Sequence, residues 1–525
     1  MAFLPSPQQS AFFAEITNGR GSVVLQAVAG AGKTTTLVEG LRLMTGYTSV
    51  IMFNKDAAAD FKAKAAKAEI DMTNIRISTC HAAGLSAWSR FDPKSASNMQ
   101  ENKTRLIIEK MIEQGNLSRE DMVLLDANIP YLAKVIDLGK QYLLGIKVKV
   151  SASAFRQLAD RFGLDMELDD TVDVEALNNY AVDIFNTCAE ACRSNSARDG
   201  MVDHSDMIWA PLYYKVKFFT NNNVVLDEAQ DTNPLRRELC RALLKPGVGR
   251  LFAVGDSAQA IYAFTGANSD ALDLIKRDFN AHEMPLTVSY RCPIKVVEFA
   301  QKWVSHIQAH PDAADGIVRQ VKLDPQPRTS SDPKPRPWYM VETLCQDDFI
   351  LCRYNRPLLQ TAFGLIKNGI PCKMAGRDIG DGLVKLATKW KVKSLDALEG
   401  KIDAWRAKEV AKAKAKHSET LEQSANDRAD CIKVFIERCR SKGMHDVSCV
   451  VAEIQALFSD KTEGYLTLSS IHKAKGRERH RVYWIQHKEP GRDMKDWEIT
   501  SERNLKYVAA TRAQSELVLV HDGTK

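Results

Sequence analysis

The sequence predicts an α/β protein with two cores built on parallel sheets, each carrying a helical insertion. Short apolar runs, typical of strands buried on both faces, alternate with amphipathic patterns over much of the chain. The alternation fades at about 90–199 and about 381–461, where apolar residues recur at three- and four-residue spacing. Sheet-forming regions interrupted in this way by helical ones indicate two α/β cores.

The strand candidates are short and apolar. They are Val23–Leu25, Ser49–Phe53, Ile75–Ser78, Val224–Leu226, Arg250–Val254, Asp348–Cys352, Gly464–Leu468 and Arg481–Ile485. A proline-rich stretch, Asp324–Pro337, should form an extended surface loop between two of them.

Composition is that of an ordinary globular chain, with 45% hydrophobic and 26% charged residues. No apolar run approaches the roughly 20 residues of a membrane span, and the start MAFLPSPQQS has no basic or apolar leader region. We therefore expect no membrane association and no secretory signal. The eleven cysteines are scattered without a CxxC pair, which favours reduced thiols over a zinc or iron–sulfur site. A net charge of +6 suits a polyanionic partner without establishing one.

One stretch, VVLQAVAGAGKTTTLVEG (Val23–Gly40), predicts a phosphate-binding loop. A strand ends in the small residues Ala29, Gly30, Ala31 and Gly32, whose backbone N–H groups can converge on a phosphate. A helix then opens at Lys33-Thr34, and its N-terminus favours negative charge. Lys33 can contact the outer phosphates and the Thr34 hydroxyl can reach Mg²⁺, as in G-x-x-x-x-G-K-[ST], except that Ala27 replaces the first glycine.

A second motif, NNNVVLDEAQDTNPL (Asn221–Leu235), places two acids after a buried strand. Ligands of open parallel sheets bind at the carboxyl ends of the strands. Asp227 can therefore hold the Mg²⁺ that bridges the outer phosphates, while Glu228 can orient or deprotonate a water for in-line attack. Adjacent acids also occur at ordinary helix N-termini, so it is the combination with the phosphate loop that favours an ATPase.

A lysine run, Lys408–Lys416, lies in the second helical region. Lysines spaced along an alanine-rich helix usually form a solvated face, and a nucleic-acid contact is the alternative.

Ordered motifs over most of the chain resemble the UvrD/Rep-like group of superfamily 1 DNA helicases. The matches are "SPQQ" (Ser6–Gln9), "AVAGAGKT" (Ala27–Thr34), "FNKDAAADF" (Phe53–Phe61), "STCHAAG" (Ser78–Gly84), "LDEAQD" (Leu226–Asp231), "VGDSAQAIYAFTGA" (Val254–Ala267), "SYRCP" (Ser289–Pro293), "TLSSIHKAKGRE" (Thr467–Glu478) and "YVAATRA" (Tyr507–Ala513). The segments Phe53–Phe61 and Ser78–Gly84 correspond to the family's motifs Ia and Ib. Their short forms are similar to those of F-box-type DNA helicases, although no F-box is recognisable. Alanine at the first loop position is usual in this family.

The resemblance implies a nucleotide site shared by two RecA-like domains. It implies that ATP binds with Mg²⁺, and that Thr34 and Asp227 hold the ion. The implied ATP-binding residues are Gln9, Ala29, Gly30, Ala31, Gly32, Lys33, Thr34, Thr35, Asp227, Tyr290 and Glu478. Gln9 would read adenine, Tyr290 would stack on it and Glu478 would contact the ribose. The implied catalytic residues are Glu228 as base, Gln259 as γ-phosphate sensor, Lys33, and Arg291 and Arg512 as arginine fingers.

The resemblance also implies contacts to single-stranded DNA by His81, Tyr262, Phe264 and His472. Stacking of bases on Tyr262 and Phe264 would grip any sequence. Alternative interpretations remain open at this stage: the two aromatic residues could belong to a core, His472 could be a capping histidine, and Arg512 could form an ordinary ion pair. Thr265 and Arg477 depart from the residues common in the family.

The implied domain organisation interleaves two cores and two insertions. It is RecA-like domain 1A at 1–89 and 200–285, helical insertion 1B at 90–199, RecA-like domain 2A at 286–380 and 462–525, and a short helical insertion 2B at 381–461.

The function that these motifs predict is an ATP-dependent DNA helicase moving 3′→5′ on single-stranded DNA, with tailed duplexes as substrates. The alternative is a DNA-stimulated translocase that displaces proteins and unwinds weakly, because the 381–461 insertion is short for the family. A nucleotide-switched binding protein is disfavoured by Glu228, Arg291 and Arg512. We expect a cytoplasmic, nucleoid-associated protein in a bacterial or viral setting and a nuclear one in a eukaryote; protein partners are not predicted.

Overall fold

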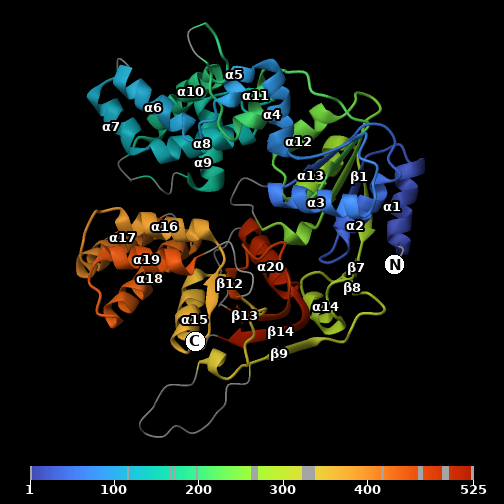
Figure 1. Cartoon of the computed structure of the whole chain (residues 1–525). Helices are drawn as coiled ribbons and strands as arrows, with labels where there is room; N and C mark the ends of the chain where they lie inside the picture. The colour runs from blue at the N-terminus through green and yellow to red at the C-terminus, as the bar shows by residue number, and fades with distance from the viewer. Residues whose placement is uncertain are drawn as a thin grey trace. The chain divides into compact units, whose positions relative to one another are not determined.

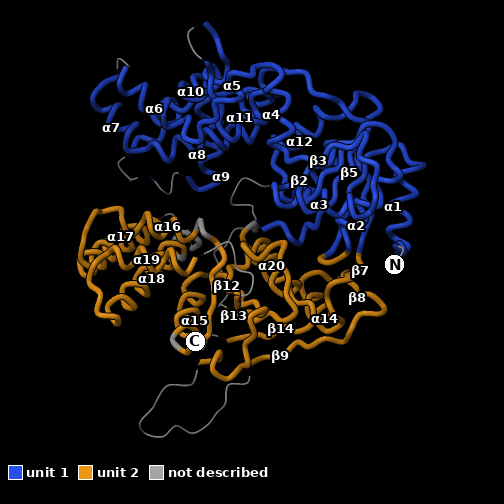
Figure 2. Tube along the Cα trace, viewed as in Figure 1, with its two compact units in different colours: residues 1–28, 32–286 blue, residues 29–31, 287–525 orange. Residues whose placement is uncertain are grey.

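The computed structural model describes residues 3–114, 117–164, 168, 172–196, 199–261, 270–321, 337–415, 419–458, 465–486 and 496–521. The chain divides into two compact units (Figure 2). Unit 1 comprises Met1–Val28 and Gly32–Leu286, and unit 2 comprises Ala29–Ala31 and Thr287–Lys525.

Unit 1 is built on a six-stranded parallel sheet with strand order β3-β2-β4-β5-β1-β6 (Figure 1). Its strands are β1 Val23–Ala27, β2 Thr48–Met52, β3 Ile75–Thr79, β4 Asn223–Leu226, β5 Arg250–Gly255 and β6 His282–Leu286. Parallel neighbours require crossover connections, and the helices that make those crossovers cover the sheet. The central strands are buried, as their apolar sequences require.

Helices supply the rest of unit 1. They are α1 Pro7–Asn18, α2 Lys33–Leu41, α3 Lys55–Lys67, α4 Cys80–Phe91, α5 Pro93–Ser97, α6 Lys103–Gln114, α7 Arg119–Ala127, α8 Ile129–Gln141, α9 Ala152–Phe162, α10 Val174–Ala191, α11 Asp206–Tyr213, α12 Pro234–Leu243 and α13 Ala271–Phe279. Side-chain caps fix several of their starts, including Asn54 for α3 and Thr79 for α4. Helices α5 to α10 fill the predicted helical region, and their buried residues join those of the sheet in one apolar cluster.

A buried cluster of charges ties these helices together. Lys103 Nζ lies 2.7 Å from Asp206 Oδ2, and Lys140 Nζ lies 2.7 Å from Asp206 Oδ1 and 2.6 Å from Asp203 Oδ2. Both lysine side chains and that of Asp206 are at most 1% exposed. Although burial alone would raise the pKa of the Asp206 carboxyl, attraction to the two lysines holds it well below its usual range.

Unit 2 contains a second six-stranded parallel sheet, with strand order β11-β12-β10-β13-β14-β9. Its strands are β9 Ile317–Gln320, β10 Phe349–Cys352, β11 Cys372–Met374, β12 Leu466–Ser470, β13 Arg479–Gln486 and β14 Ala513–His521. A separate parallel pair joins β7 Val288–Ser289 to β8 Gln308–Ala309. The helices are α14 Ile294–Ala300, α15 Asn355–Lys367, α16 Arg377–Thr388, α17 Leu395–Ala415, α18 Glu419–Ser441, α19 Val447–Leu457 and α20 Asp496–Ala510.

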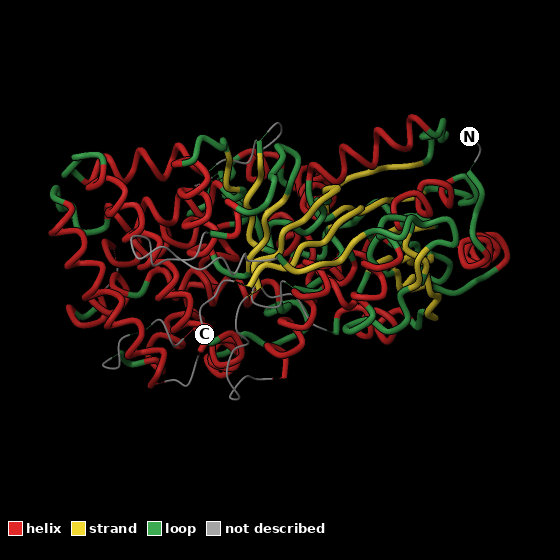
Figure 3. Tube along the Cα trace, turned by 90° about the horizontal axis from the view of Figure 1, so that it is seen from below, coloured by secondary structure: helices red, strands yellow, loops and turns green. Residues whose placement is uncertain are grey.

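The second helical region packs on this sheet. Helices α16 to α19, labelled in Figure 1, contribute buried residues to the same cluster as the strands. Figure 3 shows the helices of the chain in red and its strands in yellow. Lys414 at the end of α17 lies 3.5 Å from Glu422 Oε1 on α18. One lysine of the predicted basic run is therefore engaged with a neighbouring helix, and the last one, Lys416, lies outside the described residues.

The sequence-based strand predictions are confirmed with shifts of one or two residues at their ends, for the described part of the chain. The strands β6, β7, β8, β9, β11 and β14 were missed. β6 (HEMPL) is polar and contains Pro285, which is compatible with its place at the sheet edge. Most of the predicted loop at Asp324–Pro337 lies outside the described residues, and the boundaries of the four predicted domains stay predictions.

Among the helices described, none combines the length and apolarity that crossing a membrane requires.

Candidate functional site

The phosphate loop of unit 1 connects β1 to α2. Gly32 precedes α2 with a φ of +74°, a left-handed conformation that glycine adopts without steric cost. Lys33 is the first helical residue, and Thr36 N donates to Gly32 O at 2.9 Å. The local sequence thus directs Lys33 and Thr34 to the positive end of a helix dipole.

Two carboxylates lie beside Lys33 at the end of β4. Lys33 Nζ is 3.6 Å from Glu228 Oε1, and Asp227 is 7% exposed. Burial, with repulsion from Glu228, raises the pKa of Asp227 to about 7. Its Oδ1 atom is buried and accepts no hydrogen bond from the residues that the structure describes. An unpartnered buried carboxylate oxygen beside a phosphate loop fits a divalent cation, which would supply the missing positive charge.

Glu228 occupies a strained backbone conformation, with φ +49° and ψ +44°. Left-handed conformations are uncommon for residues other than glycine and cluster at functional sites. Gln230 holds this turn, because its Nε2 donates to Glu228 Oε2 and its Oε1 accepts from Asp256 N at 3.0 Å. Gln230 therefore joins the end of β4 to the end of β5.

Gln259 and Asp256 follow β5 at the same sheet edge. Gln259 Nε2 donates to Asp256 Oδ2 at 2.8 Å, and both residues are buried. Burial raises the pKa of the Asp256 carboxyl, with Lys33 opposing that effect. Asp256 is thus the second buried acid near Lys33, and Gln259 is fixed close to it.

Gln9 is 3% exposed and its amide is engaged at both ends. Its Oε1 accepts from Ser6 N at 2.9 Å, in a capping box, and its Nε2 donates to Thr36 Oγ1 at 2.8 Å. In this structure Gln9 anchors α1 to α2, and its reading of adenine stays a prediction.

Unit 2 brings together the three charged residues that the resemblance assigned to it. Arg291 Nη2 lies 2.6 Å from Glu478 Oε2. Arg512 is 1% exposed and donates through Nε to Val508 O at 2.9 Å. Burial and repulsion from Arg291 lower the pKa of Arg512 to about 10. Arg291 and Arg512 thus lie near one another in unit 2, and Glu478 balances part of their charge.

Two further predicted residues of unit 2 differ in exposure. Tyr290 is 47% exposed, so a face of its ring is available to a ligand. His472 is partly buried, and burial together with repulsion from Arg353 lowers its pKa to about 3. His472 is therefore neutral near pH 7.

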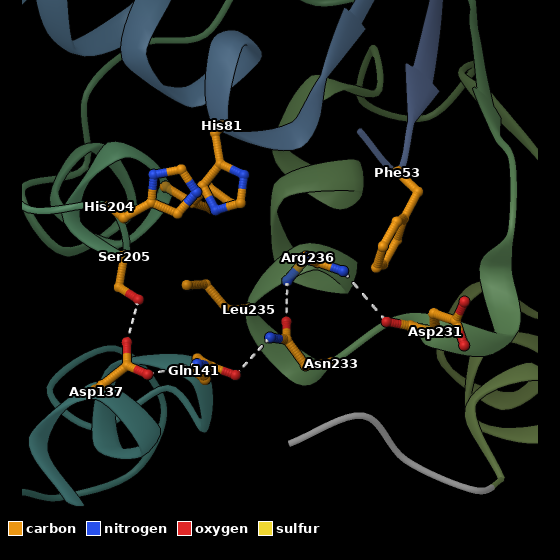
Figure 4. A pocket seen from close by; sticks show the side chains of 11 residues that line it. Phe53, His81, Asp137, Gln141, His204, Ser205, Asp231, Asn233, Leu235 and Arg236 are labelled. Atoms are coloured by element: carbon orange, nitrogen blue, oxygen red, sulfur yellow. Dashed lines mark hydrogen bonds between the residues drawn. The ribbon is translucent and has the colours of Figure 1, made fainter. Parts of the chain in front are cut away.

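A cavity of about 340 Å³ lies in unit 1 between the ends of β2 and β3 and the helical region (Figure 4). Figure 4 shows the His81 and His204 rings on one side of it and Phe53, Asp231 and Arg236 on another. The full lining is Phe53, His81, Asp137, Gln141, His204, Ser205, Ile208, Asp231, Asn233, Leu235 and Arg236.

The cavity offers flat rings and one cation. The His81 and His204 rings stack with centroids 4.0 Å apart, and the Arg236 guanidinium lies 5.0 Å from the Phe53 ring centroid. Burial, with repulsion from His204 and Arg236, lowers the pKa of His81 to about 3. Arg236 donates to Asp231 O at 3.2 Å and has no carboxylate within ion-pair distance in the described part of the chain. The lining thus combines flat rings and a guanidinium, which can contact bases and phosphates, with the carboxylates of Asp137 and Asp231.

The predicted site residues thus fall into separate groups. Lys33, Thr34, Asp227, Glu228 and Gln259 lie in unit 1, whereas Tyr290, Arg291, Glu478 and Arg512 lie in unit 2. Tyr262 and Phe264 lie outside the described residues. The sequence analysis missed Gln230, His204 and Arg236. Gln230 lies within the acidic motif and Arg236 directly follows it, but the bond from Asp256 N to Gln230 and the contact of Arg236 with Phe53 join distant segments.

No group of three or more histidine, cysteine, aspartate or glutamate side chains in the described ranges is arranged to hold a metal ion. The cation site suggested by Asp227 would thus depend on the Thr34 hydroxyl and on oxygens of a ligand.

Two family models match the chain. The UvrD/REP helicase N-terminal domain matches residues 7–280, which is more than half of the chain. The chain belongs to the UvrD/REP helicase family. The UvrD-like helicase C-terminal domain matches residues 465–520, so family membership extends to both units. The match confirms the predicted family and the predicted α/β fold class of RecA-like cores on parallel sheets.

Individual relatives match over shorter stretches. The chain is 37% identical over 98 residues to a probable DNA helicase II homolog of Mycoplasma pneumoniae, covering 18% of this chain and 14% of that protein. It is 24% identical over 240 residues to a probable DNA helicase of the same organism, covering 38% and 43%. With the ATP-dependent DNA helicase Rep of Escherichia coli it shares 23% identity over 322 residues, covering 57% and 43%. The chain thus matches less than half the length of these relatives.

Proposed function

We propose that the protein is an ATP-dependent DNA helicase that moves 3′→5′ along single-stranded DNA. The observation that carries the proposal is the convergence of Lys33, Asp227 and Glu228 at the phosphate loop, together with the paired Arg291 and Arg512 in the other unit. One half supplies the phosphate cradle and a base, and the other supplies the cations that stabilise a transferring phosphoryl group.

ATP with Mg²⁺ fits the residues of unit 1. Lys33 would contact the outer phosphates, and Thr34 and Asp227 would hold the ion. The buried, unpartnered Oδ1 of Asp227 supports this assignment, because charge on that atom needs compensation. Bound Mg²⁺ would neutralise the charge on the outer phosphate oxygens.

Hydrolysis would then depend on this chain's own side chains. Glu228, fixed by its strained turn and by Gln230, would orient the attacking water and accept its proton. Arg291 and Arg512 would stabilise charge on the γ-phosphoryl oxygens, an effect worth roughly 10³–10⁵ in rate for arginine fingers. Because the cations and the base come from different units, we propose that hydrolysis accompanies their closure and that cycles of closure drive movement along DNA.

The DNA path would cross the cavity of unit 1. Arg236 would contact phosphate, while Phe53, His81 and His204 would offer flat surfaces to bases. Such contacts tolerate any base sequence, which a translocating motor needs. We propose that Tyr262 and Phe264 add stacking contacts and that His472 contacts the strand from unit 2.

The second candidate function is a DNA-stimulated translocase that displaces bound proteins and unwinds weakly. The short second helical region, α16 to α19, favours it. Both functions share the same ATP site.

An unwinding assay with 3′-tailed, 5′-tailed and blunt duplexes, run beside single-strand-stimulated ATP hydrolysis, tests the proposal. We expect unwinding of the 3′-tailed duplex alone and strong stimulation of hydrolysis. Stimulated hydrolysis without unwinding would favour the translocase, and unwinding of the 5′-tailed duplex would refute the polarity. Lys33→Ala should abolish hydrolysis, and full turnover by that variant would refute the site.

A further inference from the structure

The pairing of β7 with β8 places an unassigned residue beside Tyr290. Val288 pairs with Gln308 and Ser289 with Ala309 in parallel register. His310 continues this register, because its backbone N–H donates to Ser289 O at 3.1 Å. Tyr290 and His310 therefore occupy the next paired position along the two short strands.

The two side chains are in contact. Their ring centroids lie 4.8 Å apart, with planes inclined by 37°. The His310 side chain is 34% exposed, and Tyr290 remains 47% exposed despite this contact. The imidazole thus supports the tyrosine ring and leaves it accessible to a planar ligand.

The orientation of the imidazole is itself fixed. Asp312 N donates to His310 Nδ1 at 3.2 Å, and this bond orients the imidazole through that nitrogen. The segment is held again farther along, where Ile294 N donates to Ala314 O at 2.9 Å and Lys295 N to Asp315 O at 2.9 Å. Backbone bonds on both sides of His310 therefore attach its loop to the segment that carries Tyr290.

We propose that His310 is a positioning residue for the purine base of the bound nucleotide, acting through Tyr290. The inference rests on the proposed function, in which ATP binds, and on the sequence-based prediction that Tyr290 stacks on adenine. An exposed tyrosine with free rotamers must be ordered when a base binds, and that ordering opposes binding. Contact with His310 already restricts the Tyr290 rotamer in the folded protein, so less conformational entropy is lost when the base binds.

This role has a distinct kinetic signature. Support of the base platform affects affinity for nucleotides that carry a base, so it alters KM for ATP and leaves kcat nearly unchanged. It does not affect a ligand made of phosphates alone. A purely structural role for the loop would alter both ligands, because Arg291 adjoins Tyr290 in the chain.

The test compares His310→Ala, His310→Phe and His310→Gln in the full chain. We measure KM and kcat for ATP with saturating single-stranded DNA, and the inhibition constant of inorganic tripolyphosphate against ATP. His306→Ala is the matched control, since His306 is an exposed histidine in the same segment.

We expect His310→Ala to raise KM for ATP about 3- to 10-fold, the range that corresponds to ordering one side chain. The inhibition constant of tripolyphosphate and kcat should change less than twofold. His310→Phe should restore most of the ATP affinity, because it keeps a ring beneath Tyr290. His310→Gln keeps an acceptor for Asp312 N but lacks the ring, so it should behave like the alanine variant, and it replaces that variant if alanine impairs folding.

Several results would overturn the inference. They are an unchanged KM in both the alanine and glutamine variants, an equal rise in the tripolyphosphate constant, a failure of phenylalanine to restore affinity, or the same effect from His306→Ala. Failure of the proposed function has another signature, because the wild-type chain itself would then show no ATP hydrolysis.

Discussion

Two buried groups of charges in unit 1 contrast in how their charge is balanced. In the helical region, Asp203 and Asp206 face Lys103 and Lys140 at 2.6–2.7 Å; the lysines hold the Asp206 pKa far below its usual range, while burial and repulsion from Asp206 raise the Asp203 pKa. At the phosphate loop, Asp227 and Asp256 are buried with raised pKa values. In the first group two lysines face two carboxylates, whereas in the second Lys33 faces the three carboxylates of Asp227, Glu228 and Asp256.

The difference separates structural from functional burial of charge. A matched cluster gives unique packing and no affinity for a ligand. An unmatched cluster is costly in the free protein, and a cation or a substrate that removes the cost binds more tightly because of it. Function is therefore best sought where carboxylates are buried without partners.

The largest effect should follow from changing the unmatched site. Glu228→Gln keeps the shape of the side chain but removes its basicity, so we expect DNA-stimulated ATP hydrolysis to fall by about 10²–10⁴-fold. The thermal unfolding midpoint should stay close to that of the wild type. Glu238→Gln, a change at a carboxylate paired with Lys147, is the control and should retain activity. Steady-state kinetics measure the hydrolysis rate, and calorimetry measures the unfolding midpoint. A fully active Glu228→Gln chain would show that the carboxylates at the phosphate loop do not serve hydrolysis.

The matched cluster should show the opposite behaviour. Asp206→Ala leaves two buried lysines competing for Asp203, and we expect a loss of about 3–5 kcal/mol of stability. Denaturant unfolding measures it. Asp60→Ala breaks an exposed pair with Lys64 and should change stability by less than about 1 kcal/mol. Equal effects from the two variants would show that the buried cluster contributes little.

The pH dependence of stability should sharpen the contrast further. The pKa of Asp227 is raised to about 7 in the folded chain, so its charged form destabilises the fold above that pH and the penalty disappears as the pH falls toward 4. Asp227→Asn should therefore raise the unfolding midpoint by a few degrees at pH 8, by less at pH 5 and hardly at all below pH 4, without Mg²⁺. Added Mg²⁺ should reduce the advantage of the variant at pH 8. A difference independent of pH would contradict this reading.

The smallest effect concerns Arg236, the arginine that lines the cavity. Arg236→Ala should weaken binding of single-stranded DNA roughly tenfold and reduce its salt slope by about one. Basal ATP hydrolysis should persist. Arg241→Ala is a matched control, because Arg241 lies on the same helix and also covers a phenylalanine, Phe279. Fluorescence anisotropy at several salt concentrations measures the DNA affinity of both variants. Equal losses of affinity in Arg236→Ala and Arg241→Ala would argue against a DNA path through the cavity.

The sequence predicted those elements of the fold whose pattern lies within one short segment of the chain. Strands such as β2 and β4 are buried on both faces, so their apolar runs identify them. β14 was missed although it lies inside the second sheet, because its first half alternates between buried and exposed residues. β6 lies at an edge and needs few apolar residues.

The same limit applies to the site. Lys33, Asp227 and Glu228 were predictable because each stands in a compact motif whose spacing fixes its place. The hydrogen bond from Asp256 N to Gln230 Oε1 and the stacking of His81 on His204 join segments that are distant in the sequence. No local sequence pattern therefore predicts these contacts. The roles of Tyr262 and Phe264, which lie outside the described residues, stay predictions.

The strand order of the first sheet constrains how the chain is made. β1 begins at residue 23, yet its edge neighbour β6 ends only at residue 286. At the usual pace of a ribosome, roughly 15–50 s pass between these points. The other neighbour of β1, β5, ends only at residue 255, so both flanks of β1 stay unpaired for most of that interval, and the phosphate loop stays without the strands that position it.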